Sequence, residues 1–111
     1  YSLKNKKILI SAAISKFEAH IFNFNFKKNI PCYRCFMPEI PHLDIKCDSE
    51  GILPTVAGIA GTLQANEVIK SIINTKNELV GKMIVLNTLS LNFRKIELTK
   101  SSNCSKECKR K

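Results

Sequence analysis

Two pairs of cysteines stand far apart in this chain. Cys32-Tyr33-Arg34-Cys35 has two residues between its thiols, and Cys104-Ser105-Lys106-Glu107-Cys108 has three. Two intervening residues let both thiolates approach one ion at tetrahedral angles, and a second pair completes a closed four-cysteine zinc site. Such a site is structural, because no position is left for water. The spacing therefore predicts a zinc ion that fixes the tail, 101–111, to a zinc-binding loop near 30–53.

Other interpretations of these cysteines stay open at the level of spacing. Two residues are commoner than three in the second pair of a zinc site, and disulfides or unligated thiols would also fit the composition. Cys47, His42 or His20 would be able to replace one ligand. Five cysteines is an odd number, however, so a closed disulfide framework would leave one thiol over.

Cys47 is left over once the four zinc candidates are assigned. A lone cysteine in an irregular loop is a candidate nucleophile, but it needs surroundings that favour the thiolate. Asp44, Asp48 and Glu50 flank it and oppose thiolate formation, while Lys46 is the only adjacent cation. The residues alone favour an unreactive loop thiol.

Length and charge restrict the class of protein. With 111 residues the chain fits one domain, and no run of eighteen apolar residues occurs that would cross a membrane. The net charge of +9 raises nucleic acid as a partner, but the 18 basic residues are 15 Lys and 3 Arg and are scattered along the chain. We expect a solvated basic surface on a cytoplasmic protein without membrane contact, and we keep nucleic acid only as an alternative partner.

Apolar patterning predicts the elements that must position the cysteines. Residues 8–15 indicate a strand buried on both faces, and 18–26 indicate a half-exposed strand with Phe22 and Phe24 on one face and Asn23 on the other. A long loop spans 30–53, a helix 54–74, and two further strands 82–87 and 89–98. This order predicts an α/β fold with a mixed sheet and one main helix.

The predicted helix carries an apolar stripe and two glycines. Gln64, Glu67 and Lys70 lie off the stripe, whose members recur at helical spacing: Ala65, Val68, Ile69, Ile72 and Ile73. Gly58 and Gly61 weaken a helix, so their presence suggests that another backbone passes close to this face.

Several motifs in order resemble the second half of the ThiF, MoeB and HesA adenylyltransferases, relatives of the ubiquitin-activating enzymes. The opening stretch Ile10 to Ala13 followed by Phe17-Glu18 takes part in the likeness, which spans nearly the whole chain. The other motifs are Cys32-Tyr33-Arg34-Cys35-Phe36, Gly51-Ile52-Leu53-Pro54, Ala57-Gly58-Ile59-Ala60-Gly61-Thr62-Leu63-Gln64-Ala65-Asn66-Glu67-Val68-Ile69-Lys70, Gly81-Lys82, Asn92-Phe93-Arg94 and the closing cysteine pair.

The resemblance implies a fold, an activity and a set of site residues. Family members use ATP and magnesium to adenylate the carboxy-terminal glycine of a ubiquitin-like sulfur-carrier protein, and they dimerise. The positions of Cys32, Cys35, Cys104 and Cys108 hold zinc in them. Cys47 falls where some members carry a cysteine that bonds covalently to the carrier. The implied fold is the carboxy-terminal half of a ThiF-type, Rossmann-like α/β domain, with a zinc-pinned tail.

The nucleotide-binding half of that family is not recognisable here. The only glycines are 51, 58, 61 and 81, which form no phosphate-binding loop, so no residue is expected to bind ATP or magnesium. We expect residues 1–111 to be the carboxy-terminal part of such a domain, inactive alone, that needs an amino-terminal half or a second subunit. The alternatives are a stand-alone basic zinc module that contacts nucleic acid, and a non-functional gene remnant.

Overall fold

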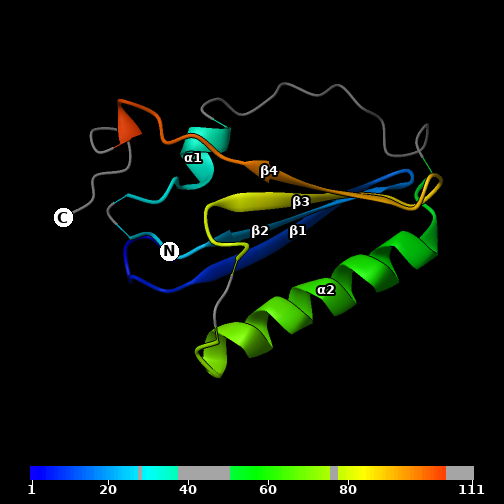
Figure 1. Ribbon diagram of the computed structural model, residues 1–111, viewed down its shortest axis with the longest axis horizontal. Helices are drawn as coiled ribbons and strands as arrows, with labels where there is room; N and C mark the ends of the chain where they lie inside the picture. Colours follow the sequence, from blue (N-terminus) through cyan, green and yellow to red (C-terminus); the bar gives the residue numbers. More distant parts are fainter. Residues whose placement is uncertain (28, 38–50, 76–77, 105–111) are drawn as a thin grey trace.

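Four strands form one sheet, and one long helix packs on it (Figure 1). The computed structural model describes residues 1–27, 29–37, 51–75 and 78–104. All neighbouring strands pair antiparallel in the order β1-β2-β3-β4, and Asn23 and Val80 form one isolated parallel bridge. The elements in chain order are β1 (Leu9–Ser15), β2 (Glu18–Phe24), α1 (Tyr33–Phe36), α2 (Pro54–Ile72), β3 (Lys82–Asn87) and β4 (Asn92–Glu97). The predicted α/β architecture with one main helix is confirmed.

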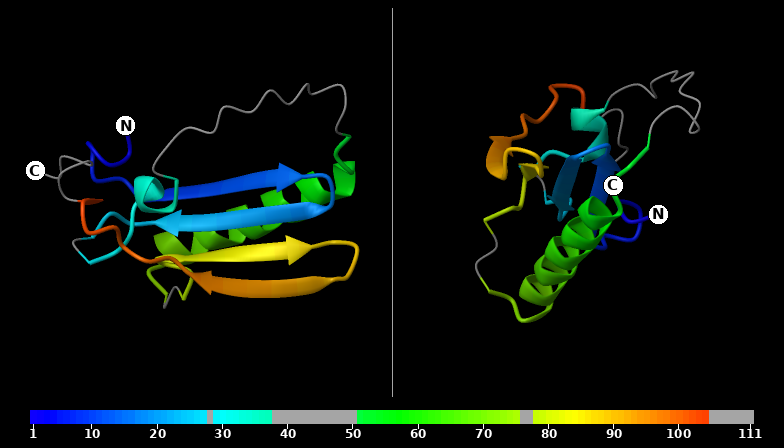
Figure 2. Two further views of the ribbon diagram at one scale, coloured as in Figure 1. Left: turned by 90° about the horizontal axis from the view of Figure 1, so that it is seen from above. Right: turned by 90° about the vertical axis from the view of Figure 1, so that its right-hand side faces the viewer.

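The sheet carries an apolar cluster on each face. On one face, Ala19 and Leu86 pack with Val56 and Ala60 of α2. On the other face lie Phe22, Phe24, Met83 and Val85, with Phe36 of α1 packed against them. Successive strand residues point to opposite faces, so β2 supplies both clusters. Figure 2 shows α2 crossing one face only.

The burial of β1 and β2 differs from the expectation. Residues of β1 are half-buried or exposed, because β1 is an edge strand of the described sheet and not a strand buried on both faces. β2 is the buried strand, from Ile21 through Phe24. Asn23, expected on an exposed face, is 1% exposed, since α2 covers the face that its neighbours Ala19 and Ile21 share.

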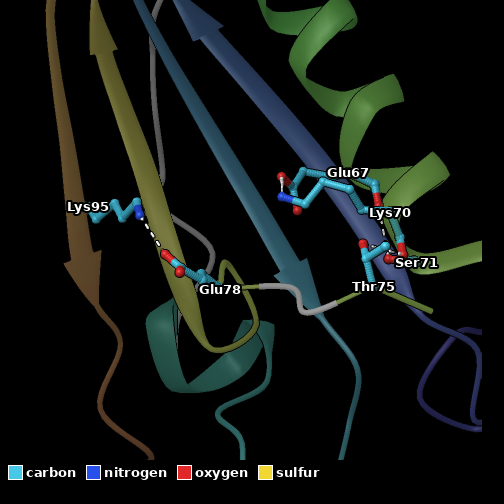
Figure 3. Close-up of polar contacts among 6 residues, drawn as sticks. All are labelled: Glu67, Lys70, Ser71, Thr75, Glu78 and Lys95. Atoms are coloured by element: carbon cyan, nitrogen blue, oxygen red, sulfur yellow. Dashed lines mark hydrogen bonds and ion pairs between the residues drawn. The ribbon is translucent and has the colours of Figure 1, made fainter. Parts of the chain in front are cut away.

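Helix α2 begins at Pro54, as predicted, but packs through a different face. Its buried residues are Val56, Ala60 and Glu67, whereas the predicted apolar stripe includes the exposed Ile69 (56%) and Ile72 (75%). The polar side chains on the side of α2 that faces the sheet have polar partners. Lys70 pairs with the Glu67 carboxylate, and Gln64 Nε2 donates to the Ile10 carbonyl at 2.9 Å. Figure 3 shows the Glu67 and Lys70 pair, and the separate ion pair of Lys95 with Glu78.

Gly81 links the sheet to both cysteine-bearing segments. Its amide donates to the Asn23 carbonyl at 3.3 Å, and its carbonyl accepts from the Leu98 amide at 3.1 Å. A Cβ built on Gly81 would lie 3.5 Å from Ile30 Cγ2 and from Pro31 Cδ. The φ of +74° is one that residues other than glycine rarely adopt. Gly81 therefore lets the segment before Cys32 approach the end of β4.

No helix in the described parts of the chain is long and apolar enough to cross a membrane.

Replacing Asn23 with valine should stabilise the protein. Neither polar atom of the Asn23 side chain has a hydrogen-bond partner among the described residues, and an unpaired buried amide costs about 1–3 kcal/mol. Valine also favours a strand. We expect the free energy of unfolding of Asn23→Val, measured by urea denaturation, to rise by about 1 kcal/mol. A fall of the same size would show that the amide is satisfied in solution.

Replacing Gly81 with alanine should destabilise the protein by about 1–2 kcal/mol, because an L-residue at this φ is strained. The measurement is again chemical denaturation. Gly51→Ala is the matched control, since Gly51 has nothing within 4 Å of a built Cβ and no positive φ. Equal effects at the two positions would contradict the role given to Gly81.

Candidate metal centre

Three cysteine sulfurs meet at one end of the sheet. Cys32 Sγ lies 3.8 Å from Cys35 Sγ and 3.7 Å from Cys104 Sγ. All three sulfurs lie within 4.8 Å of one another. Cys32 and Cys104 are 2% and 1% exposed, and Cys35 is half-buried. The cluster therefore brings together residues 72 positions apart in the chain, in a largely water-excluded place.

The first two sulfurs are positioned by α1 and the aromatic cluster beneath it. Cys32 precedes α1, and its carbonyl accepts from the Cys35 amide at 3.0 Å, which turns both side chains the same way. The Phe36 ring lies 5.0 Å from the Phe22 ring, and Tyr33 meets Phe24 edge-on at 6.1 Å. Aromatic pairs in these geometries are favourable, so they hold the short helix against the sheet.

The third sulfur comes from the turn that follows β4. The Cys104 amide donates to the Ser101 carbonyl at 3.1 Å, which closes this turn. The Leu98 amide binds Gly81, and Leu98 packs against the cluster of Phe22 and Phe24. The path from β4 to Cys104 is therefore anchored on the same face of the sheet as α1.

The sulfur separations fit a metal ion and not a disulfide. A disulfide needs sulfurs about 2.05 Å apart, far shorter than the two distances seen here. Zinc binds thiolates at about 2.3 Å in a tetrahedron, and the edge of that tetrahedron is about 3.8 Å. Cys32, Cys35 and Cys104 are thus spaced as three corners of such a site, and thiolates are soft ligands that suit zinc. The three cysteines could hold a metal ion.

The structure bears on some of the predicted site residues and not on others. It brings Cys32, Cys35 and Cys104 together, as the spacing predicted. Cys108, Cys47 and His42 lie outside the described residues. His20 lies in β2, where its Nε2 is 3.6 Å from a carboxylate oxygen of Glu18, and it is not in the cysteine cluster. The sequence analysis did not predict that Gly81 supports the cysteine-bearing segments. The available signal was a glycine directly before a predicted strand.

Comparisons with known proteins agree with the geometry. Residues 1–108 match the ThiF family. The adenylyltransferase and sulfurtransferase MOCS3 of Dictyostelium discoideum is 36% identical over 103 residues, which cover 89% of this chain and 24% of that protein. The molybdopterin-synthase adenylyltransferase of Salmonella typhimurium is 29% identical over 96 residues, 86% of this chain and 39% of that protein. The chain thus spans well under half the length of these curated relatives.

Solved structures show the same fold. The crystal structure of Escherichia coli MccB superimposes with a TM-score of 0.73 at 18% identity, and the match covers 95% of this chain and 33% of that one. The family match covers nearly all of the sequence and the fold agrees with it. The chain therefore belongs to the ThiF family.

Proposed function

We propose that this chain is the carboxy-terminal portion of an ATP-dependent adenylyltransferase that activates the carboxy-terminal glycine of a ubiquitin-like sulfur-carrier protein, of the molybdopterin or thiamine synthesis type. The observation that carries the proposal is the ThiF match over residues 1–108, joined to relatives that are named as adenylyltransferases. In the reaction, a carboxylate oxygen of the carrier attacks the α-phosphorus of ATP. An acyl-phosphate bond forms, and pyrophosphate leaves.

The contribution of this chain is structural support and not phosphate chemistry. ATP and magnesium belong to a nucleotide-binding half that precedes this region in the family, and the chain has no glycine-rich loop to hold phosphates. We assign that half, whether a separate polypeptide or part of the same one, as the partner with which this chain would catalyse adenylation. A second subunit and the carrier protein are the other partners. Thiol ligands for a metal also suit a reducing compartment, so we place the protein in the cytoplasm.

We further propose that Cys32, Cys35, Cys104 and Cys108 bind one structural zinc ion. Three sulfurs at tetrahedral spacing support this assignment, and Cys108 is the fourth thiol available near Cys104 in sequence. The ion would offset the repulsion between the negatively charged thiolates, and it would join α1 to the segment after β4. Four thiolates close the coordination sphere, so the ion would have no catalytic position.

Cys47 remains a candidate for covalent attachment to the carrier. Its support is the position it shares with the cysteine of some family members, and its acidic neighbours oppose thiolate formation. A carrier-linked species that disappears with Cys47→Ser and with reducing agent would support this role.

Nucleic-acid binding is a weaker proposal in the light of the fold. Single-stranded nucleic acid is held by exposed aromatic rings that stack on bases. Phe22 and Phe24, the aromatic residues interleaved with polar ones in the sequence, are 3% and 0% exposed. The net charge of +9 and the exposed Phe93 (58%) beside Arg94 still favour this alternative.

Removing one thiol should weaken zinc binding. We expect one zinc ion per chain by elemental analysis, and Cys32→Ser or Cys104→Ser should weaken zinc binding by more than about 100-fold, because loss of a ligand exceeds the cost of losing a supporting contact. Cys47→Ser is the matched control and should retain full stoichiometry. A zinc-free wild-type chain, or zinc loss in the control, would contradict the four-cysteine assignment.

The chain alone should show no ATP-dependent exchange of pyrophosphate, because it lacks phosphate-binding residues. A chimera that carries this chain in place of the matched region of the Dictyostelium relative should show exchange that depends on a carrier ending in glycine. Exchange by the isolated chain would refute the division of labour proposed here. A folded, zinc-loaded chimera without exchange would refute the adenylyltransferase assignment.

A further inference from the structure

The three cysteines of the described cluster differ in their access to water. Cys32 and Cys104 are 2% and 1% exposed, whereas Cys35 is half-buried. Cys35 lies in α1 directly after Arg34, which is exposed. The susceptibility of a cysteine to oxidation follows its exposure and its thiolate character. Cys35 is therefore the member of the cluster that a dissolved oxidant reaches first.

A second sulfur lies close enough to react with Cys35 once Cys35 is oxidised. Cys32 Sγ is 3.8 Å from Cys35 Sγ, and the Cys35 amide donates to the Cys32 carbonyl at 3.0 Å, so one hydrogen-bonded turn holds the two residues together. A disulfide needs sulfurs about 2.05 Å apart, so the two sulfurs must approach each other by less than about 2 Å. Cys104, in contrast, comes from a different segment, after β4. Redox-sensitive cysteines are typically accessible and next to a second thiol, and this pair has both features.

We propose that Cys35 is a peroxide-sensitive modification site, and that Cys32 converts its oxidised form into a Cys32–Cys35 disulfide. The Cys35 thiolate attacks one oxygen of hydrogen peroxide, the O–O bond breaks, and hydroxide leaves and takes up a proton to become water. The Cys32 thiolate then attacks the sulfur of the resulting sulfenic acid, and a second hydroxide leaves and is protonated. The two thiolates lose two electrons in total, and one peroxide is reduced to two water molecules.

The disulfide excludes a metal ion from the cluster. Only the thiolate form of cysteine binds zinc, and the disulfide removes two thiolates from the set of four that we propose as ligands. The inference rests on the proposed zinc site for this step alone. The ion leaves with its charge unchanged, and the segment after β4 loses its link to α1. Oxidation at Cys35 thus controls whether the two cysteine-bearing segments stay joined.

The test is treatment of the purified, zinc-loaded protein with hydrogen peroxide, followed by alkylation of the free thiols and mass spectrometry of tryptic peptides. Trypsin cleaves after Lys and Arg, so Arg34 separates the two cysteines into peptides 29–34 and 35–46, and Cys104 falls in 101–106. We expect a linked pair of peptides 29–34 and 35–46. A colorimetric chelator should detect one zinc ion released per linked pair, and a thiol reductant with added zinc should reverse both changes.

Two variants separate disulfide formation from the loss of metal. Cys32→Ser and Cys104→Ser each remove one proposed ligand, but only Cys32→Ser removes the thiol that reacts with oxidised Cys35. Cys104→Ser should therefore still form the linked pair. Cys32→Ser should instead accumulate the sulfenic acid of Cys35, so that dimedone labelling of peptide 35–46 rises at least about tenfold over the wild type. Cys47→Ser should behave as the wild type does.

A main product that links Cys104 to Cys32 or to Cys35 would overturn the proposal. Dimedone labelling of Cys32→Ser no greater than that of the wild type would also overturn it, as would zinc that stays bound after the linked pair has formed. A protein that is purified without zinc and still forms the linked pair would reject the zinc site of the proposed function and retain Cys35 as the modification site.

Discussion

The approach of Cys32 to Cys104 is the contact on which the organisation of one end of this molecule depends. The two sulfurs lie 3.7 Å apart although 72 positions separate them in the chain. Closing so long a loop has an entropic cost, and burying two thiols side by side gives little in return without an ion. Support for the contact comes from the Phe22, Phe24 and Phe36 cluster and from the positive φ of Gly81. A metal bound there would stabilise the whole loop closure.

Strand β2 connects this end of the molecule to α2. Its Phe22 and Phe24 contact the rings of α1, and its Ala19 packs on the opposite face with Val56 and Ala60. Because adjacent residues of one strand serve the two clusters, β2 must be buried on both faces, although four of its seven residues are polar or small. As a consequence the Asn23 amide is buried, because neither face of β2 is exposed at this position.

The sequence predicted best those features whose cause is local. The spacing of Cys32 and Cys35 and the proline in the first turn of α2 act within a few residues of themselves. The two sulfurs lie close together, and α2 begins at Pro54. The errors concern which layer covers which face. An apolar run does not distinguish the edge strand β1 from a central strand, and periodicity did not identify the inward face of α2, because a helix with apolar residues on two sides has two candidate stripes. Glu67 was predicted to lie off the buried stripe. Its burial depends on the sheet that covers it and on its ion pair with Lys70, and periodicity does not reveal either contact.

Helix α2 carries apolar residues on more than one side. The helix packs on the sheet through Val56 and Ala60, and it also presents Val68, Ile69 and Ile72 outward. The cysteine cluster lies with α1 on the opposite face of the sheet, beyond Phe22 and Phe24. The cysteine cluster and α2 therefore use different faces of β2, so loss of a bound metal would loosen α1 without removing the contacts of Ala19 with α2. In this arrangement a metal ion would reinforce one side of the sheet, and α2 covers the other side.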